Sequence, residues 1–374
     1  MVRILLTGDL CPINRIESLS LDNDYSSIFG DFIDVFQRND LNIIDLECPL
    51  TTSNSPRKKT GPHQKAHPDC IKILKYAGIQ LAAMANNHMM DYGSGGANET
   101  LELFQGNEIQ TLGIGRSLLE AAKPFSKKIK DRRISILNYA DNEFLTAPDG
   151  AYTCNSLDAV RCFYEIRRAR EYHDFVIVII HAGNEFYELP APRTKMLFHY
   201  LIDLGADAVI SHHTHSFSGY EVYNEKVIFY GLGNFLYDWP GKFNSDWNKG
   251  YVVRLFLSDK LNFEIIPLKQ NNEKPGVYHL NEEESNEFNF KLDRLNNIIA
   301  DDHKLESAFQ EYCISVYPMY DAFIEPYFGK YITALQKRGY LPKLISQKKR
   351  LFYLNLTRCE SHRDVMIRML KQFE

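Results

Sequence analysis

Three histidines stand within four positions of the stretch AVISHHTHSFSGYE, residues 208–221. His212, His213 and His215 directly follow a run of residues that is typical of a buried strand. Imidazole is costly to bury without a partner, and three protonated rings in one place would repel each other. Coordination to a metal ion removes both problems. The stretch therefore predicts a metal site, provided that other parts of the chain supply further ligands.

Side chains that bind metals also follow the other predicted strands. They are Asp9 in TGDLCP, Asp45 and Glu47 in DLECP, Asn87 and His88 in ANNHMMDYG, and His181 in IIHAGNEFY. Each has an ordinary alternative, because strand-end carboxylates commonly form turns or cap helices, and a buried histidine is commonly a hydrogen-bonded structural group. Five strand ends that all present such side chains are harder to attribute to turns, because a layered fold brings those ends together.

The donor set indicates which metals would bind. Carboxylates, a carboxamide and imidazoles suit Mn, Fe, Zn or similar divalent ions, whereas an all-thiolate set would not. Six or more ligands exceed what one tetrahedral zinc needs. Two ions about 3.5–4 Å apart, bridged by a carboxylate, would use them all, and such pairs activate a hydroxide and hold phosphoryl oxygens for displacement.

Short β-rich runs alternate with amphipathic helical patterns up to about residue 270. The expected strands are 3–9, 41–47, 79–88, 132–140, 175–183, 207–215, 226–238 and 250–268, and the expected helices are 26–39, 67–78, 98–107 and 193–205. Helices between strands predict layered α/β packing, with reactive groups at strand ends and in the loops that follow them.

Composition shifts near residues 269–276, which have the character of a linker. We therefore expect an α/β domain over 1–270 and a helical extension over 271–374. Its helices should be short, with breaks at Pro326, Gly329, Gly339 and Pro342. The extension would act as a lid, a docking surface or a contact for a homo-oligomer. The basic and apolar stretch 341–352 either binds an anionic partner or is a solvated helix face, which we favour.

Composition bounds the function. The formal net charge of −5 gives no reason to expect a nucleic-acid partner. Seven scattered cysteines, an odd number, favour reduced thiols over a disulfide framework. The apolar run at the N-terminus is too short for a signal peptide, and FVIVII at 175–180 is far shorter than a membrane span. These features predict a cytoplasmic protein without a transmembrane segment.

Six motifs occur in an order that resembles a known family. GDL, DLE, ANNHxxDYG, HAGNEFY, SHHTH and YGLGNF follow one another as in the CapA-like proteins of poly-γ-glutamate capsule synthesis, which are similar to the calcineurin-like metallophosphoesterases. The similarity covers about residues 1–265, including EAAKPF at 120–125 and LIDLGADAVI at 201–210. The resemblance implies a four-layer α/β/β/α sandwich, in which two mixed sheets are flanked by helices.

The resemblance also implies ligand roles. By it, Asp9 and His215 bind the first metal, and Asn87, His181 and His213 bind the second.

The bridging carboxylate falls in the segment with Asp45 and Glu47. We favour Glu47, because the position of Asp45 is usually Asn in the family and Asp45 then adds a further carboxylate. His88 resembles the histidine that does not bind metal but protonates the leaving group, a task for a side chain that can hold a proton near neutral pH.

Cys11 departs from the pattern, because many metallophosphatases have His at this position. It is either a thiolate ligand, which would favour Zn or Fe, or a buried structural thiol. Asp91 is expected to orient the site or cap a helix. Asn184 and Glu185 either contact substrate or cap a helix, and Asn234 shapes a loop near the site or contacts substrate.

Three further histidines are expected to be structural. His212 would orient a ligand or pack in the core, and His63 and His67 would lie on the surface or cap helices.

Together these features favour a hydrolase with two divalent ions, Mn, Fe or Zn, that cleaves a phosphoester in cell-surface polymer metabolism. The substrate would be a small or polymeric anion. Two alternatives remain: amide hydrolysis or transfer on a polyglutamate-like polymer, and a non-catalytic accessory role in surface-polymer assembly.

Overall fold

The structure is a computed structural model that describes residues 1–324, 331–332, 335, 340 and 345–371. Within them, eight strands form a first mixed sheet in the order β16-β15-β14-β1-β2-β3-β4, with β13 paired to β1. The strands are β1 Val2–Cys11, β2 Leu41–Leu46, β3 Leu81–Ala83, β4 Gln110–Leu112, β13 Asn234–Tyr237, β14 Lys249–Leu257, β15 Leu261–Gln270 and β16 Val277–His279.

A second mixed sheet has the order β11-β12-β10-β9-β7-β6. Its strands are β6 Phe125–Ile129, β7 Arg132–Ala140, β9 Phe175–His181, β10 Ala208–His212, β11 Tyr220–Tyr223 and β12 Lys226–Phe229. The central strands β7, β9, β10 and β12 run parallel. A small two-stranded sheet pairs β5 Ile114–Gly115 with β8 Thr153–Cys154.

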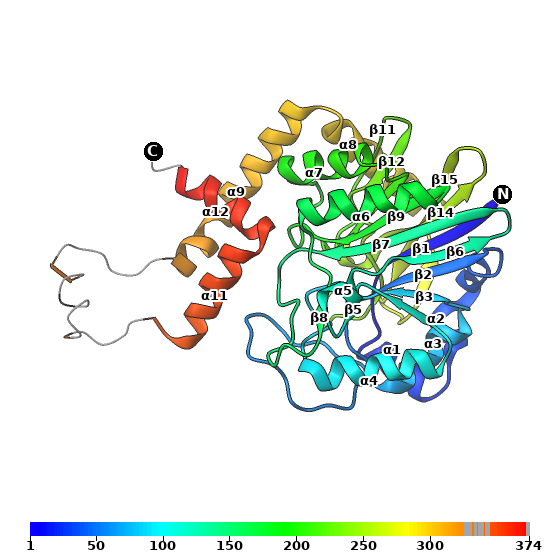
Figure 1. Cartoon of the computed structure of the whole chain (residues 1–374), viewed down its shortest axis with the longest axis horizontal. Coiled ribbons are helices and arrows are strands. Elements are labelled where there is room, and N and C mark those ends of the chain that lie inside the picture. Colours follow the sequence, from blue (N-terminus) through cyan, green and yellow to red (C-terminus); the bar gives the residue numbers. More distant parts are fainter. Residues whose placement is uncertain (325–330, 333–334, 336–339, 341–344, 372–374) are drawn as a thin grey trace.

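Helices cover the outer face of each sheet, so the molecule is a four-layer α/β/β/α sandwich, as expected (Figure 1). One outer layer contains α1 Arg15–Leu21, α2 Tyr25–Phe29, α3 Ile71–Tyr76 and α4 Gly93–Gly106, and the other contains α6 Ala159–Tyr172 and α7 Pro192–Asp203. Short helices α5 Leu118–Ala121, η1 Gly30–Val35, η2 Pro68–Cys70 and η3 Asp246–Asn248 lie in the connections.

Apolar strands form the core between these layers. All seven residues of β9, FVIVIIH, are buried, as expected for a parallel strand covered on both faces. One cluster joins the two sheets to α6 and α7, through side chains such as Ile177 and Phe198, and a second joins the first sheet to α1–α4, through Ile44 and Ile73.

Three predicted elements differ from those observed. The helix expected over 26–39 divides into α2 and the 3-10 helix η1, because Gly30 takes a φ of 50°. The strand expected over 79–88 ends at Ala83: the backbone N–H of Met84 still donates to Leu112 of β4 at 2.9 Å, but that of Ala85 binds the side chain of Asn138 at 2.8 Å.

The run 226–238 was expected to be one stretch of strand and hairpin material. It forms β12 in the second sheet and β13 in the first, and the chain crosses between the sheets at Gly231–Gly233. Gly233 has a φ of 74°, a conformation that side chains other than glycine rarely adopt.

The C-terminal part is helical, with α8 Glu282–Ile299, α9 Asp302–Ile324, α11 Gln347–Arg358 and α12 Glu360–Lys371. Strand β16 continues the first sheet beyond residue 270, so the expected division at that residue stays a prediction. The expected breaks at Pro326, Gly329, Gly339 and Pro342 lie outside the described residues. Helices α9, α11 and α12 stand at the end of the sandwich opposite the N-terminus of the chain (Figure 1).

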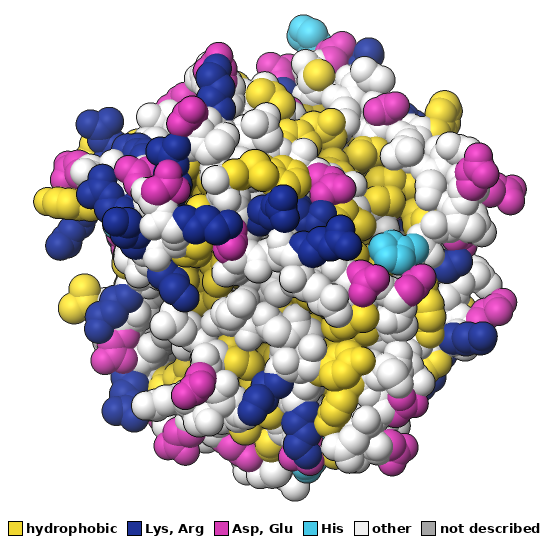
Figure 2. Space-filling view, turned by 90° about the vertical axis from the view of Figure 1, so that its right-hand side faces the viewer, with side chains coloured by type: hydrophobic (Ala, Val, Ile, Leu, Met, Phe, Trp, Pro, Cys, Tyr) yellow, Lys and Arg dark blue, Asp and Glu magenta, His cyan; other side chains and the backbone are white. Residues whose placement is uncertain are grey.

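The opposite end of the molecule is shown in Figure 2, where Lys and Arg side chains form a band with Asp and Glu side chains among them. A hollow of about 610 Å³ at the starts of β7, β9 and β12 is lined by such charges. They form ion pairs, such as Arg132 with Asp259 at 2.8 Å and Arg170 with Asp207 at 2.7 Å. Because these charges are paired with one another, the hollow carries no surplus of basic groups.

Candidate metal centre

The first sheet brings three polar side chains side by side, two near the carboxyl ends of β1 and β2 and one at the start of β13. In the register of the sheet, Asp9 of β1 is opposite Asp45 of β2 on one side and Asn234 of β13 on the other. The approach of β13 requires Gly8, because a Cβ there would collide with the carbonyl oxygen of Gly233. The backbone N–H of Asp9 donates to that same carbonyl at 3.0 Å.

The second sheet contributes histidines from two neighbouring strands. His181 ends β9 and is opposite His212 of β10, and the chain then turns through His213 and His215. These last two residues have φ values of 87° and 53°, in the left-handed region that residues other than glycine rarely adopt. Such strain persists where the surrounding structure imposes it, often at functional sites.

The first group of candidate ligands surrounds the Nε2 atom of His181. Nε2 lies 3.1 Å from Asn87 Oδ1, 3.1 Å from His213 Nδ1 and 3.7 Å from Glu47 Oε1. The other ring nitrogen, Nδ1, lies 3.1 Å from Asp45 Oδ2. When Nδ1 carries the ring proton and donates it to Asp45, Nε2 is left with a lone pair that can bind a metal ion.

The protonation states of His181 and His213 also fit a metal site. Burial lowers the pKa of His181 to about 3 and that of His213 to about 4, so both are neutral at pH 7. The four atoms are thus two nitrogens of neutral imidazoles, an amide oxygen and a carboxyl oxygen, all of which can coordinate a metal ion. A cation would satisfy them.

The second group surrounds His215. Its Nε2 lies 3.4 Å from Glu47 Oε1, and its Nδ1 lies 3.4 Å from Asp9 Oδ2 and 3.0 Å from Asn234 Oδ1. The amide of Asn234 is oriented by its Nδ2, which donates to the carbonyl oxygen of Trp247 at 3.1 Å. Because both neighbours of Nδ1 are acceptors, that nitrogen carries the proton and Nε2 is free to bind a metal.

Glu47 belongs to both groups. It is fully buried, and neither carboxylate oxygen has a hydrogen-bond partner in the described part of the chain. Burial raises its pKa well above the ordinary range, and raises that of Asp45 to about 8. Burial acts in the same direction on Asp9, but the hydrogen bond from His215 and the charges of nearby histidines outweigh it and lower its pKa to about 2. Cations beside Glu47 would remove the cost of its burial.

His88 lies next to these groups with two partners of its own. Its Nδ1 is 2.7 Å from Asp91 Oδ2 and 3.2 Å from Lys59 Nζ, and Lys59 and Asp91 form a buried ion pair. Burial, followed by the charge of Lys59, lowers the pKa of His88. Asp91 also accepts from the backbone N–H of Gln64 at 2.7 Å, which ties the 57–66 loop to the site.

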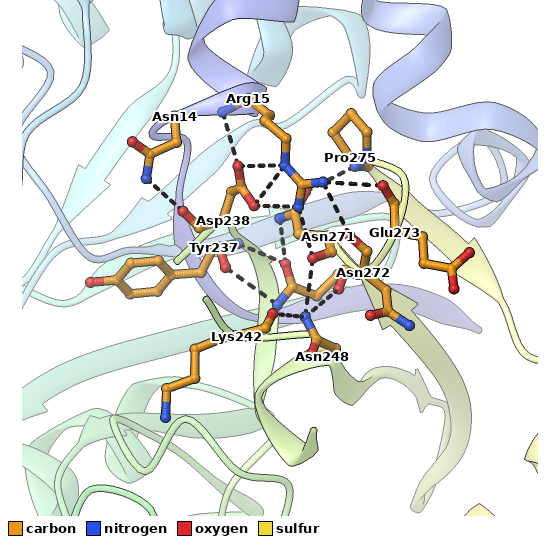
Figure 3. Close-up of polar contacts among 12 residues, drawn as sticks. Asn14, Arg15, Tyr237, Asp238, Lys242, Asn248, Asn271, Asn272, Glu273 and Pro275 are labelled. Atoms are coloured by element: carbon orange, nitrogen blue, oxygen red, sulfur yellow. Dashed lines mark hydrogen bonds and ion pairs between the residues drawn. The ribbon is translucent and has the colours of Figure 1, made fainter. Parts of the chain in front are cut away.

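Behind His215, an ion pair fixes the end of β13 (Figure 3). The guanidinium of Arg15 holds Asp238 through Nη2 to Oδ1 at 2.6 Å and Nε to Oδ2 at 2.9 Å, and also donates to the carbonyl oxygen of Asn271 at 3.0 Å. The preceding Tyr237 places its ring edge-on against His215, with centroids 5.3 Å apart. This network therefore supports the ring of His215 from outside the metal centre.

The other predicted residues lie around the centre. Cys11 is buried beside Cys48 and Tyr237, and burial raises its pKa well above the ordinary range. It belongs to none of the ligand groups found among the described residues. Asn184 donates to the carbonyl oxygen of Ser361 at 3.4 Å, and Glu185 is exposed.

The remaining histidines make local contacts. His212 Nε2 lies 2.9 Å from the carbonyl oxygen of Thr7, and His63 Nε2 lies 2.6 Å from that of Arg57. His67 caps η2 by accepting from the backbone N–H of Asp69.

Several residues at the site have no counterpart in the sequence predictions. Glu143 follows β7 and places Oε2 3.8 Å from His213 Nε2. It carries the same signal as the predicted ligands, a carboxylate after a strand. Arg57, Lys59 and Arg358 surround the ring of Phe144, at 5.5, 5.3 and 4.5 Å from its centroid. Arg57 and Lys59 stand in the basic run SPRKKTGPH, whereas no sequence signal connects Arg358 to the site.

The fold and the site define an α/β/β/α sandwich with buried Asp, Glu and His groups that could hold metal ions at one edge. The family described as "Bacterial capsule synthesis protein PGA_cap" matches residues 3–239, and the chain belongs to this family. The resemblance to CapA-like proteins is thereby confirmed. Among the described residues, every helix is too short or too polar to cross a membrane.

Curated relatives agree with this assignment. "PGA biosynthesis protein CapA" of Bacillus subtilis (strain 168) is 31% identical over 235 residues, which cover 62% of this chain and 62% of that protein. "Capsule biosynthesis protein CapA" of Bacillus anthracis is 29% identical over 182 residues, which cover 47% and 44%. The chain thus spans less than two thirds of the length of these relatives.

Solved structures show only a distant likeness. The 5'-nucleotidase from Candida albicans SC5314 matches with 10% identity and a TM-score of 0.41, over 84% of this chain and 57% of that chain. A similarity this weak gives no information about function.

Proposed function

We propose that this protein is a metal-dependent phosphoesterase that holds two divalent cations and acts in cell-surface polymer metabolism. The observation that carries the proposal is the arrangement of acceptor atoms around His181 Nε2. Asn87, His213 and Glu47 face this atom at 3.1 to 3.7 Å. The unpartnered, buried carboxylate of Glu47 supports the same proposal.

The residues divide into two ligand sets that share Glu47. Asp9, Glu47 and His215 form one set, and Glu47, His181 and His213 form the other, to which Asn87 adds its amide oxygen. Manganese, iron and zinc suit this mixture of oxygen and nitrogen donors. When bound, two such cations supply Lewis-acid stabilisation of the charge that develops on phosphoryl oxygens.

Asp45 would act from behind the second set. Its Oδ2 faces Nδ1 of His181, the ring nitrogen opposite the ligand atom. A carboxylate at this place holds the proton on Nδ1, fixes the ring orientation and keeps Nε2 free as a ligand. We therefore favour a positioning role for Asp45 over its predicted role as a metal ligand.

His88 would give a proton to the leaving oxygen. Asp91 and Lys59 both approach Nδ1, so Nε2 is the ring nitrogen left to carry the transferred proton. Because Asp91 accepts from His88 at 2.7 Å, it favours the protonated ring, while Lys59 opposes it. Positioned acid groups of this kind typically contribute about 10²- to 10⁴-fold to rate.

An anionic substrate fits the charges beside the centre. Besides the cations around Phe144, Lys242 lies 4.8 Å from the ring of Phe186, an exposed aromatic side chain whose ring is tilted against that of His215, with centroids 6.2 Å apart. The names of the curated relatives refer to capsule and PGA biosynthesis, which supports a substrate from surface-polymer metabolism for this chain as well.

The test is the variant His88→Ala, assayed with an aryl phosphate monoester and diester. We expect kcat to fall by about 10²- to 10⁴-fold while bound metal, measured by elemental analysis, stays at the wild-type level. His181→Ala and His215→Ala should instead lose metal. His303→Ala, which changes an exposed histidine of α9, is the matched control and should keep both metal and activity.

Two outcomes would contradict the proposal. Loss of metal in His88→Ala would show that His88 is a ligand and not the acid. A fully metal-loaded protein that hydrolyses neither ester would exclude phosphoesterase activity, and a parallel assay with γ-glutamyl amides would then separate an amide hydrolase from an accessory protein.

A further inference from the structure

A second group of metal-binding side chains lies where the C-terminal extension meets the sandwich. Glu143, Cys359 and His362 each offer a ligand atom, and these atoms all lie within 4.8 Å of one another. Cys359 is 1% exposed and Glu143 is 8% exposed, so two of the three are buried in the interface. This group shares no residue with the two ligand sets of the candidate metal centre.

The fold places these side chains from two directions. Glu143 follows β7 of the second sheet, while Cys359 stands between α11 and α12 and His362 lies in the first turn of α12. The spacing Cys-x-x-His at the start of a helix brings both side chains to the same side. The backbone N–H groups of Ser361 and His362 also face the sulfur of Cys359.

The contacts of Glu143 leave room for a further partner. Its Oε1 accepts from Asn355 Nδ2 at 2.8 Å and forms an ion pair with His362 Nε2 at 3.6 Å, while Nδ1 of His362 lies 2.6 Å from the hydroxyl of Tyr320. A carboxylate has about four acceptor positions, so the bond from Asn355 does not exhaust it. Thiol, imidazole and carboxylate thus lie close enough to share one ion, which would take the place of the long contact between histidine and carboxylate.

We propose that Glu143, Cys359 and His362 bind a zinc ion that fastens the C-terminal extension to the sandwich. Sulfur, nitrogen and oxygen donors of this kind are the usual ligands of zinc, and three protein ligands leave a fourth tetrahedral position open. Burial, above all, raises the pKa of the Cys359 thiol, whereas the two backbone N–H groups act in the opposite direction. Zinc would therefore displace the thiol proton as it binds.

The site would also act on the neighbouring metal centre. Glu143 Oε2 lies 3.8 Å from Nε2 of His213, so an ion that fixes Glu143 also fixes the carboxylate beside that candidate ligand. Ser361, next to the site, donates to Asp141 Oδ2 at 2.5 Å, and Arg193 of α7 binds Asp364 of α12 at 2.6 Å. These contacts hold the same interface without metal, so loss of zinc should loosen it and not unfold the protein.

The experiment measures metal stoichiometry in the full chain by elemental analysis. We expect Cys359→Ser and His362→Ala each to bind one equivalent of zinc less than wild type. Cys313→Ser, which changes another buried cysteine of the extension, is the matched control and should bind as many as wild type. Circular dichroism establishes that each variant is folded, and Glu143→Gln gives a third, independent removal of a ligand.

Cobalt substitution supplies a second readout, because only thiolate coordination gives a sulfur-to-metal charge-transfer band. We expect this band in wild type and in Cys11→Ser, and its loss in Cys359→Ser. A band lost in Cys11→Ser but kept in Cys359→Ser would overturn the proposal and assign the thiolate to the metal centre. Equal zinc content in wild type and Cys359→Ser would overturn it as well.

The outcome is separable from that of the proposed function. If the dinuclear centre does not form, wild type should hold the one zinc that Cys359→Ser loses. If the site at the extension does not form, wild type should hold two ions, and Cys359→Ser should keep both.

Discussion

Asp45 is a buried carboxylate whose Oδ1 has no hydrogen-bond partner among the described residues, and this makes Asp45→Asn a sharp perturbation. Asparagine keeps an acceptor for Nδ1 of His181, which lies 3.1 Å from Asp45 Oδ2, but carries no charge. We expect the metal-free variant to be more stable than metal-free wild type at pH 7. Bound metal would therefore offset the destabilising effect that the buried Asp45 has on the fold in the absence of metal.

The size and sign of the effect follow from the pKa. Burial raises the pKa of Asp45 from 3.8 to about 8, so between these values the folded protein binds a proton that the unfolded chain has released. Wild type therefore loses stability as pH rises through this window, by up to about 1.4 kcal/mol per pH unit. At pH 7 the upper limit is about 4 kcal/mol, from which an unpaired buried amide in the variant subtracts about 1–3 kcal/mol.

The assay is urea unfolding of chelator-treated proteins at pH 5 and pH 7. The stability advantage of Asp45→Asn should grow by about 2–3 kcal/mol between these pH values, a change that the cost of the amide does not affect. Asp131→Asn, which removes an exposed carboxylate, is the matched control. An advantage that is the same at both pH values would refute the reasoning. Metal content of Asp45→Asn separates the two roles, since it is retained if Asp45 positions His181 and reduced if Asp45 is a ligand.

Three further predictions follow from contacts around the site. Lys59→Met removes the cation that lowers the pKa of His88, so this pKa should rise, as measured by NMR titration of the ring; an unchanged pKa would contradict the role of Lys59. Gly8→Ala places a Cβ against the carbonyl oxygen of Gly233, just before β13, and should reduce bound metal. Wild-type metal content would show that β1 and β13 can move apart without loss of the site. Arg15→Met removes the cation that pairs with the buried Asp238 and should lower the free energy of unfolding, measured with urea, by about 1–3 kcal/mol. An unchanged free energy of unfolding would show that this ion pair does not stabilise the fold.

Much of the fold follows from the pattern of the sequence. Alternation of strands and amphipathic helices predicts the layers, and apolar runs such as FVIVII at 175–180 lie in central strands. The differences arise where tertiary contacts outweigh local preference. The run 226–238 is apolar enough for one extended stretch, but a glycine at positive φ directs its second half into the other sheet.

The candidate site was predictable for the same reason as the fold. Strand ends converge, so Asp9, Asn87 and His181 could be expected near each other from strand order alone, and the structure brings them together. Their metal roles stay predictions. Arg358 and His362 could not be found in this way, because they reach the site through the docking of a distant helical segment and not through the register of a sheet.

Several unfavourable features of the protein lie at one place, and they support the proposal that cations bind there. His213 and His215 both have positive φ angles, and the buried carboxylate of Glu47 has no hydrogen-bond donor among the described residues. Neutral imidazoles and an amide oxygen also face each other at 3.1 Å. Each feature costs about 1–3 kcal/mol, a large fraction of the stability of an ordinary domain. Ligands that bind to these shared donor atoms would remove such costs, so we expect binding of divalent cations to raise the free energy of unfolding.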